Sequence, residues 1–491
     1  MRSLLVSSIG VATAAALAVP LSLSLHEAPT PPRSAKAARA AHPGGPGDPA
    51  GPGSTRSLPL VPLGAENRAG GGTSTRGLAR RDVQPFSLLG VVWENPRAEL
   101  RGTVQVRTRS TTTGAWSDWQ DLEAHHGEHG ADSGTAEARA HAVRGATAPL
   151  WVGDSNGVEV RVRAANATGP GTARAALPRG LRVELVDPGD DSGEVSGASG
   201  AAAASADPEP DTEQTPREQA GESPRETSPA PAEAAGTGDT ETEAAADTAG
   251  EAAADAPTQA AADTAADAAA EAAADIVGDA VVAPQLPEDY IGPRPPIVTR
   301  RGWGADESLR EAHFLYTNTV RAAFIHHSAT GNNYTCAQAP SLLRSIYRYH
   351  TVSLGWRDIG YNFAIDKCGN IYEGRAGGVA RAVQGAHTLG FNSNSTGIAV
   401  LGTFTTSTPP AAAVTAAAQL TSWKLGLHGR DPRATTTLTS AGGNLYKKGT
   451  TAKLKVISGH RDGYATECPG AKLYEKLGTI RTAAAKYQGR S

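Results

Sequence analysis

Strict alternation of apolar and polar residues marks several short stretches between residues 83 and 187. The stretches 102–108, 158–163 and 181–186 each place apolar side chains at every second position. A period of two puts these side chains on one face of a strand, and the Gly- and Asn-rich breaks between the stretches are typical of turns. The pattern therefore predicts an antiparallel β-sandwich over residues 83–187. No catalytic constellation stands out there, so we expect a binding or spacer module.

Three histidines of this module, His125, His126 and His129, lie in a Gly-rich stretch. Imidazole is the commonest metal ligand among side chains, so the cluster is a candidate metal site. We interpret it instead as a solvated loop.

Residues 290–491 combine strand and helix periodicities. Leu343, Ile346, Tyr347 and His350 recur at helical spacing, which predicts a helix with one apolar face. Further helices are expected at 409–427 and 469–487. Strands are expected at 320–326, 361–366, 371–373, 396–402 and 454–457, the second and third forming a hairpin. Because strands and helices alternate, we predict an α/β domain with a mixed central sheet flanked by helices.

Three other segments have no folding pattern of their own. Residues 1–28 read as an export signal, with Arg2 before a Leu-, Val- and Ala-rich run. A membrane anchor is the alternative, but the apolar part is short and interrupted by Ser and Pro. Residues 29–82 are rich in Pro, Gly and Ala, and residues 188–289 are Ala-rich and acidic. We expect a disordered leader and a disordered linker, because neither segment can bury enough apolar surface.

Composition narrows the functional classes. The chain has 491 residues, of which 39% are hydrophobic, and a net charge of −4. Such a charge does not attract a polyanion, so nucleic acid is not an expected partner. Three cysteines are an odd number for an exported chain. If Cys468 binds a metal, Cys336 and Cys368 remain to form one disulfide.

A candidate metal site is spread over two distant stretches. His460 and Cys468 lie eight residues apart on a loop punctuated by Gly and Pro, and His326 and His327 end an apolar run. Zinc binds imidazole and thiolate, and catalytic sites keep an open fourth position. Adjacent strand residues point to opposite faces, so only one of the paired histidines is expected to be a ligand, and spacing does not say which. Zinc bound in this way suits amide hydrolysis.

An ordered set of motifs joins these stretches. The motifs are HHSAT (326–330), GWRDIGYNF (355–363), EGR (373–375), GAHT (385–388) and GHRD-x4-ECPG (459–470), with the lead-in RGWGA (301–305). Together they resemble the peptidoglycan recognition protein / type 2 N-acetylmuramoyl-L-alanine amidase family. The resemblance covers roughly residues 295–488, and the overall plan resembles secreted actinobacterial members.

The resemblance implies roles for individual residues. His326, His460 and Cys468 match the zinc ligands, and Tyr361 matches a tyrosine that assists catalysis. Thr466 stands where amidase-type phage lysozymes carry a catalytic Lys, a departure that leaves its catalytic role open. A further group offers candidates for the substrate groove, with structural roles equally open, and consists of Trp356, Arg375, His387 and Asn392. Arg375 would meet a peptide carboxylate through a bidentate contact.

The expected function is zinc-dependent hydrolysis of the amide between N-acetylmuramic acid and L-alanine in peptidoglycan. Family members that only recognise peptidoglycan usually lack the Cys ligand, which this chain keeps. We expect a secreted monomer, or one loosely associated with the cell wall, that does not insert into membranes once its signal is removed. Two alternatives are a non-catalytic peptidoglycan-binding protein and a zinc hydrolase that acts on another amide.

Overall fold

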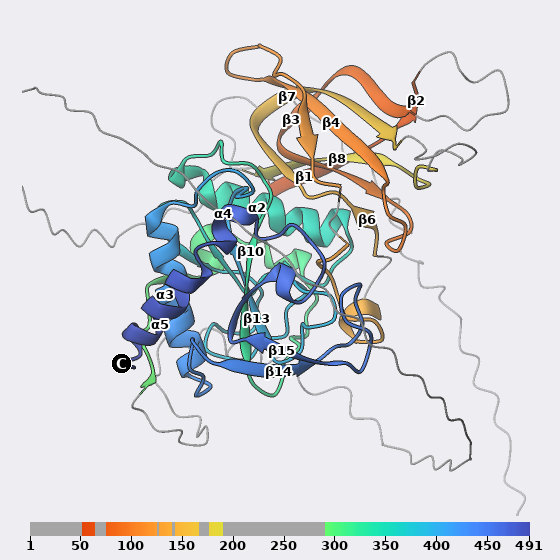
Figure 1. Ribbon diagram of the computed structural model, residues 1–491. Coiled ribbons are helices and arrows are strands. Elements are labelled where there is room, and N and C mark those ends of the chain that lie inside the picture. The colour runs from red at the N-terminus through yellow and green to blue at the C-terminus, as the bar shows by residue number, and fades with distance from the viewer. Residues whose placement is uncertain (1–51, 64–74, 125–126, 140–142, 166–175, 190–289) are drawn as a thin grey trace, which may run out of the picture. The chain divides into compact units, whose positions relative to one another are not determined.

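The computed structural model describes residues 52–63, 75–124, 127–139, 143–165, 176–189 and 290–491 (Figure 1). These residues belong to one compact unit that begins at Ala50. The predicted signal and almost all of the predicted linker lie outside the described residues. None of the helices in the described part of the chain has the length and hydropathy that a bilayer span requires. A β module, residues 52–189, precedes an α/β domain, residues 290–491.

The β module is built on one eight-stranded sheet in which every pairing is antiparallel. Its strands are β1 (Pro52–Pro59), β2 (Val61–Pro62), β3 (Thr75–Trp93), β4 (Gly102–Ser110), β5 (Gln120–Leu122), β6 (Gly145–Ala146), β7 (Leu150–Ala164) and β8 (Arg182–Gly189). The strand order is β1-β8-β3-β7-β4-β5, and β2 and β6 pair with β3. Alternating residues such as Val104, Val106 and Val160 form a buried core, so the predicted antiparallel β fold is confirmed.

The predicted disordered leader, 29–82, is wrong where β1, β2 and the start of β3 lie. Strand β1 is at one end of the sheet and pairs with β8 through its backbone, from Pro52 opposite Gly189 to Pro59 opposite Arg182. An edge strand of this kind needs few apolar side chains, because main-chain hydrogen bonds hold it in place. Amino-acid composition alone therefore does not predict strand β1.

The α/β domain contains a mixed six-stranded sheet of order β16-β10-β13-β11-β12-β9. Its strands are β9 (Ile297–Val298), β10 (Ala322–His327), β11 (Phe363–Ile365), β12 (Ile371–Glu373), β13 (Ser395–Val400) and β16 (Ile457–Gly459). All pairings are parallel except that of β11 with β12, which forms the predicted hairpin. A separate antiparallel pair consists of β14 (Thr435–Thr439) and β15 (Thr451–Lys455).

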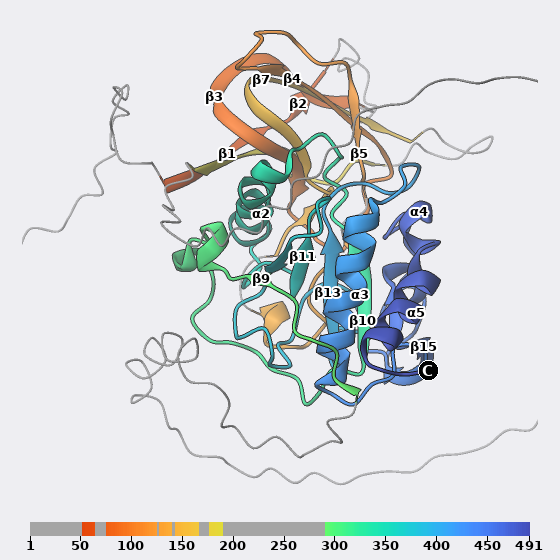
Figure 2. The same cartoon turned by 90° about the vertical axis from the view of Figure 1, so that its left-hand side faces the viewer.

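Helices cover both faces of this sheet (Figure 2). The α-helices are α2 (Ala339–Arg348), α3 (Ala411–Gly426), α4 (Ala471–Tyr474) and α5 (Leu477–Tyr487), and α2 continues into a π-helical turn, η7 (Tyr349–Ser353). Short 3-10 turns are η2 (Glu137–Arg139), η4 (Arg301–Trp303), η5 (Glu307–Leu309), η6 (Cys336–Gln338) and η8 (His460–Asp462). Helices α3 and α5 pack on Ile325, Ile365 and Ile398, whereas α2 packs on the face that carries Ala364 and Ala399. The predicted α/β architecture is confirmed.

A disulfide joins Cys336 in η6 to Cys368 in the turn after β11, as the cysteine count predicts. It closes a sequence separation of 32 residues. Loops of this size stabilise the folded state by about 3 kcal/mol, because the bond restricts the unfolded chain.

The β module packs against helix α2 through apolar side chains. Leu88, Val92 and Val186 of the module share one buried cluster with residues of α2 such as Leu343 and Ile346. Polar contacts surround this cluster: the Tyr349 hydroxyl donates to the Thr147 carbonyl at 3.1 Å, and the Trp151 amide donates to the Thr330 carbonyl at 3.0 Å. An apolar interface of this kind holds two modules together more firmly than a polar one.

Candidate metal centre

The carboxyl ends of parallel strands bring two histidines to one edge of the sheet. Strands β10 and β16 pair in parallel with Ile325 opposite Gly459, so His326 and His460 follow at the same level. Along β10, Ala323 and Ile325 face the core under α3, while Phe324 faces another cluster. Because the side chains of a strand alternate, His326 lies on the side of Phe324 and His327 points to the opposite face.

Four buried side chains gather at this edge. One nitrogen or sulfur atom from each of His129, His326, His460 and Cys468 lies within 4.8 Å of the others. The Sγ of Cys468 is 3.8 Å from Nδ1 of His326, and the rings of His326 and His460 have centroids 4.6 Å apart. Imidazole nitrogens and a thiolate are the donors that zinc takes in proteins. The structure thus brings the three ligands expected from the resemblance together and adds His129.

A second histidine holds His326 in orientation. Nε2 of His326 lies 3.2 Å from Nδ1 of His387, whose Nε2 lies 3.4 Å from Oγ of Ser395. The Ser395 hydroxyl in turn donates to the Phe391 carbonyl. This series of hydrogen bonds assigns a proton to Nε2 of both His326 and His387. It leaves Nδ1 of His326 without a proton, facing the Cys468 thiol. Partners of this kind fix the tautomer of metal-binding histidines.

Two glycines make room for the His387 ring. A Cβ on Gly397 would lie 2.3 Å from Cγ of His387, and one on Gly385 would lie 2.5 Å from its Cδ2. Any larger residue at Gly397 would displace the ring. His387 is fully buried and contacts His326.

The neutral imidazole donors suit a cation. Burial, together with His460 and His387, lowers the pKa of His326 well below its ordinary value, so the ring is neutral. Burial lowers the pKa of His387 to about 3. Burial also raises the pKa of the Cys468 thiol well above its ordinary value, although the His327 amide hydrogen-bonds to Sγ at 3.4 Å. A thiolate in such an enclosure requires a positive charge beside it, which a bound metal ion supplies.

Tyr361 and Thr466 adjoin the donors. The ring of Tyr361 lies 5.5 Å from that of His326 and 5.6 Å from that of His129, centroid to centroid. Burial raises the pKa of Tyr361 well above its ordinary value, so its hydroxyl keeps its proton. The Oγ1 of Thr466 accepts a hydrogen bond from the Cys468 amide at 3.1 Å and therefore fixes the loop that carries the thiol.

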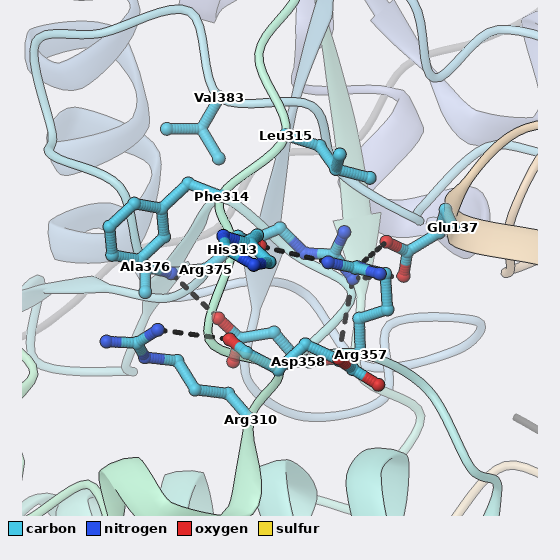
Figure 3. Close-up of a pocket in the computed structure, with 11 residues that line it drawn as sticks. Glu137, Arg310, His313, Phe314, Leu315, Arg357, Asp358, Arg375, Ala376 and Val383 are labelled. Carbon is cyan, nitrogen blue, oxygen red and sulfur yellow. Dashed lines mark hydrogen bonds and ion pairs between the residues drawn. The ribbon is translucent and has the colours of Figure 1, made fainter. Parts of the chain in front are cut away.

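Two of the remaining groove candidates, Arg375 and Asn392, contact the β module. Arg375 forms a buried ion pair with Glu137, its Nη2 lying 2.8 Å from Oε1 (Figure 3). The side-chain amide nitrogen of Asn392, Nδ2, donates to the Asp132 carboxylate at 3.0 Å and to the Gly130 carbonyl at 2.8 Å. The remaining candidate, Trp356, stacks on a neighbouring helix-end histidine, His350, with centroids 4.4 Å apart.

The interpretation of the histidine-rich stretch as a solvated loop is wrong for His129. This side chain is only 7% exposed and stacks edge-on against His460 with ring centroids 4.6 Å apart. His125 and His126 lie outside the described residues. The signal in the sequence was the cluster of histidines itself. Neither periodicity nor spacing connects that cluster to motifs located two hundred residues later.

The fold and the donors define an α/β protein with a buried His/Cys site of metal-binding geometry at the carboxyl edge of its sheet. Residues 316–471 match the family model described as N-acetylmuramoyl-L-alanine amidase, and residues 40–179 match one described as an N-terminal galactose-binding domain-like module. The chain belongs to the peptidoglycan recognition / N-acetylmuramoyl-L-alanine amidase family, as the motifs predict.

Two relatives from Drosophila melanogaster support this assignment. Peptidoglycan-recognition protein SC2 of Drosophila melanogaster is 33% identical over 183 residues, which are 37% of this chain and 85% of that protein. Peptidoglycan-recognition protein SC1a of the same species is 34% identical over 160 residues, 33% of this chain and 73% of the relative. The solved structure of wild-type Drosophila PGRP-LB is 29% identical and aligns with a TM-score of 0.30 over 38% of this chain and 93% of its own.

Proposed function

We propose that the chain is a zinc-dependent N-acetylmuramoyl-L-alanine amidase that hydrolyses the bond between N-acetylmuramic acid and L-alanine in peptidoglycan. The observation that carries this proposal is the meeting of His326, His460 and Cys468 beside Tyr361 at one edge of the sheet. The names of the family model and of the relatives support peptidoglycan as the substrate class.

Each residue of the site has a distinct part in the proposal. His326, His460 and Cys468 hold the metal, while His387 orients His326. Zinc held by such donors supplies a Lewis acid that polarises a carbonyl and lowers the pKa of water. The protonated hydroxyl of Tyr361 donates a hydrogen bond to the oxygen on which negative charge develops. Thr466 is a positioning residue, since its oxygen holds the Cys468 amide.

The disulfide and residues 1–28 support a location outside the cytoplasm. The Cys336–Cys368 bond suits an oxidising environment outside the cytoplasm. We infer that residues 1–28 are an export signal, and that the protein acts as a secreted monomer on or near the cell wall. Peptidoglycan, but not nucleic acid, is its partner in this proposal.

Hydrolysis of purified peptidoglycan by the full-length protein tests the function. Stem peptides with a free L-alanine amino group, detected by mass spectrometry, are expected in the presence of zinc. Their release should fall to the background rate with a chelator or with Cys468→Ala, because zinc loses its thiolate ligand. His428→Ala is the matched control, since His428 contacts Thr319 and is not among the four donors.

A recognition protein without turnover is the second candidate. The donor geometry of His129 favours it, because four protein ligands are typical of structural zinc sites. If the protein sediments with cell walls with zinc, with a chelator and as Cys468→Ala, while glycan and peptide stay joined in all three, a binding function would replace the amidase activity.

A further inference from the structure

One loop of the β module carries four buried polar side chains into the α/β domain. This module loop, residues 127–139, lies between β5 and β6 and ends in η2. Glu128, His129, Asp132 and Glu137 are each at most 7% exposed, although they belong to a Gly- and Ala-rich segment without large apolar residues. Burying carboxylates is costly unless partners are provided. The groups of the α/β domain that bind these side chains therefore show which ligand groups the same surface could bind.

The partners of Asp132 line one end of the site. Its carboxylate accepts hydrogen bonds from the Gly390 amide at 2.6 Å, the Asn392 amide at 3.2 Å and the Asn392 side chain at 3.0 Å. The same Asn392 side chain donates to the Gly130 carbonyl. The residues beside His387 thus present donors to a carboxylate and a peptide carbonyl.

Glu137 occupies an arginine-rich pocket at another end. Its carboxylate lies 2.8 Å from Nη2 of Arg375 and 3.6 Å from Nε of Arg357. Figure 3 shows Glu137 entering on a ribbon of the β module and pointing toward these guanidinium groups. Arg310 and His313 also line the pocket, together with the carboxylates of Glu311 and Asp358. A pocket with several cationic side chains suits the carboxylate of a ligand, and Glu137 takes that place.

At its start, before these two anchors, the loop reaches the metal donors. The Thr466 hydroxyl donates to Glu128 at 2.6 Å, and the Leu389 amide donates to the Glu128 carbonyl at 3.0 Å. The next residue, His129, places its ring between His326, His460 and Tyr361. A catalytic zinc site needs an open position, and a fourth donor from His129 would fill it.

We propose that the module loop is an internal inhibitor of the amidase, with His129 as a fourth metal ligand and with Asp132 and Glu137 occupying subsites for the carbonyl and carboxylate groups of the stem peptide. This inference rests on the proposed function. The protein is then latent, and it becomes active when the loop leaves the groove.

The way in which the module is attached makes such a release feasible. Apolar residues such as Leu88 and Val186 dock the module on helix α2, whereas the loop is held by polar contacts. Polar contacts exchange with water or with a competing ligand at little net cost. The loop can therefore leave while the module stays docked. A glycan-linked peptide that supplies its own carbonyl and carboxylate groups is the expected competitor.

Cobalt substitution tests the fourth ligand without measuring turnover. Co²⁺ replaces zinc in the full-length protein, and the visible spectrum is recorded before and after excess thiocyanate is added. The wild-type spectrum should not change, because His129 fills the coordination sphere. The spectrum of His129→Ala should change as thiocyanate binds. Asp118→Asn, an exposed change in the same module, should behave as the wild type.

Release of stem peptides tests the inhibition. The triple variant His129→Ala/Asp132→Asn/Glu137→Gln should hydrolyse peptidoglycan about tenfold faster than the wild type or more, because the open form becomes the populated one. Asp118→Asn should leave the rate unchanged. If the triple variant does not fold, as judged by circular dichroism, His129→Ala alone serves in both experiments.

The outcomes separate this inference from the proposed function. Equal hydrolysis by the wild type and the loop variants would overturn the inhibition and leave the amidase intact. A wild-type cobalt spectrum that responds to thiocyanate as His129→Ala does would overturn the ligand. Hydrolysis by no variant, with a thiocyanate response in His129→Ala only, would overturn the amidase and keep His129 as a ligand of a closed site.

Discussion

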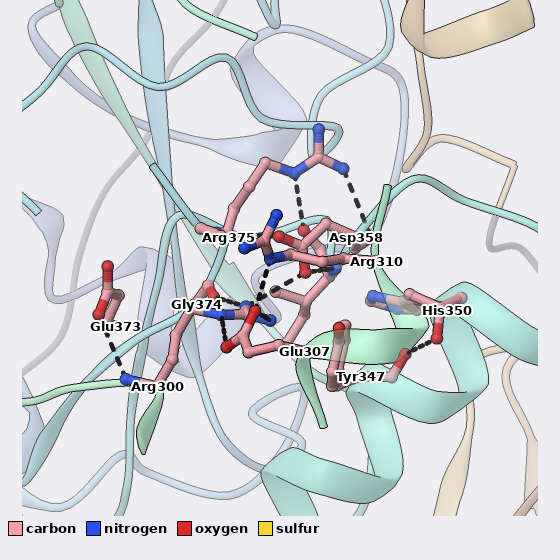
Figure 4. A network of polar contacts seen from close by, with 12 residues as sticks. Arg300, Glu307, Arg310, Tyr347, His350, Asp358, Glu373, Gly374 and Arg375 are labelled. Carbon is pink, nitrogen blue, oxygen red and sulfur yellow. Dashed lines mark hydrogen bonds and ion pairs between the residues drawn. The ribbon is translucent and has the colours of Figure 1, made fainter. Parts of the chain in front are cut away.

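Two clusters of polar side chains, the second of which includes His129 of the β module, differ in how their charges are balanced. In the first, the guanidinium of Arg300 forms ion pairs with Asp358 at 3.2 Å and Glu307 at 2.8 Å, and it also donates to the Gly374 carbonyl (Figure 4). In the second, the donors of the metal centre are imidazoles and a thiol, with no carboxylate or guanidinium among them. The first cluster is complete as it stands, whereas the second has the donors and the geometry to hold a cation.

The difference gives a rule for interpreting buried polar groups in this fold. Arg300 also stacks over Tyr347 at 4.8 Å, so the cluster joins the beginning of the domain to helix α2 and to the chain that follows β12. Such contacts stabilise the fold. The metal centre lies at the end of strands and gathers imidazole and thiol donors that suit one metal ion, as expected of a functional site.

The largest effect on stability is expected from breaking the balanced cluster. Asp358→Ala should lower the free energy of unfolding by about 3 kcal/mol, because the Arg300 guanidinium loses its buried partner and keeps only Glu307, whose side chain is 42% exposed. The Asp358 carboxylate also accepts from the Ala376 amide at 2.9 Å. Denaturant unfolding measures the change, and zinc content at low temperature should stay at the wild-type value.

The control for this prediction is Glu475→Ala, which removes an exposed ion pair with Lys472. Pairs of that kind contribute less than about 1 kcal/mol. A variant at Asp358 that unfolds like the wild type but loses zinc would reverse the roles assigned to the two clusters.

A smaller effect, confined to the metal, is expected from the residue behind His326. His387→Ala should weaken zinc binding by about 10- to 100-fold, since the ring that fixes the orientation of His326 is lost. Competition with a chromophoric chelator measures the affinity. His428→Ala serves again as control. An unchanged affinity would mean that packing alone orients His326, and that the proton chain to Ser395 has no part in metal binding.

The sequence predicts one side of the metal centre well and the other side not at all. His326 and His460 follow apolar strands, and parallel strand ends meet at one edge, so these motifs could be joined by reasoning about topology. His129 comes from a loop without periodicity in another module. Its place depends on how the module docks, which local patterns do not encode.

A signal of docking was nevertheless present in strand β3. Residues 88–93 form an apolar run rather than an alternation, and a continuous run indicates a strand with both faces covered. In the structure, Leu89 and Val91 face the core of the module, while Leu88 and Val92 face helix α2. The apolar run indicates that a second layer covers strand β3, but it does not indicate that helix α2 forms this layer.

The smallest effect on metal binding is expected one residue after His326. His327→Asn should leave zinc affinity unchanged, because the His327 side chain faces away from the donors, with Nδ1 3.4 Å from the Phe404 amide. His326→Asn should abolish tight binding, since zinc then loses a ligand. Competition with a chelator compares the two variants. The pair tests the register of β10, because a slip of one residue exchanges the faces of the two side chains. If the effects were exchanged, His327 would be the ligand, and the parallel pairing of Ile325 with Gly459 could not hold.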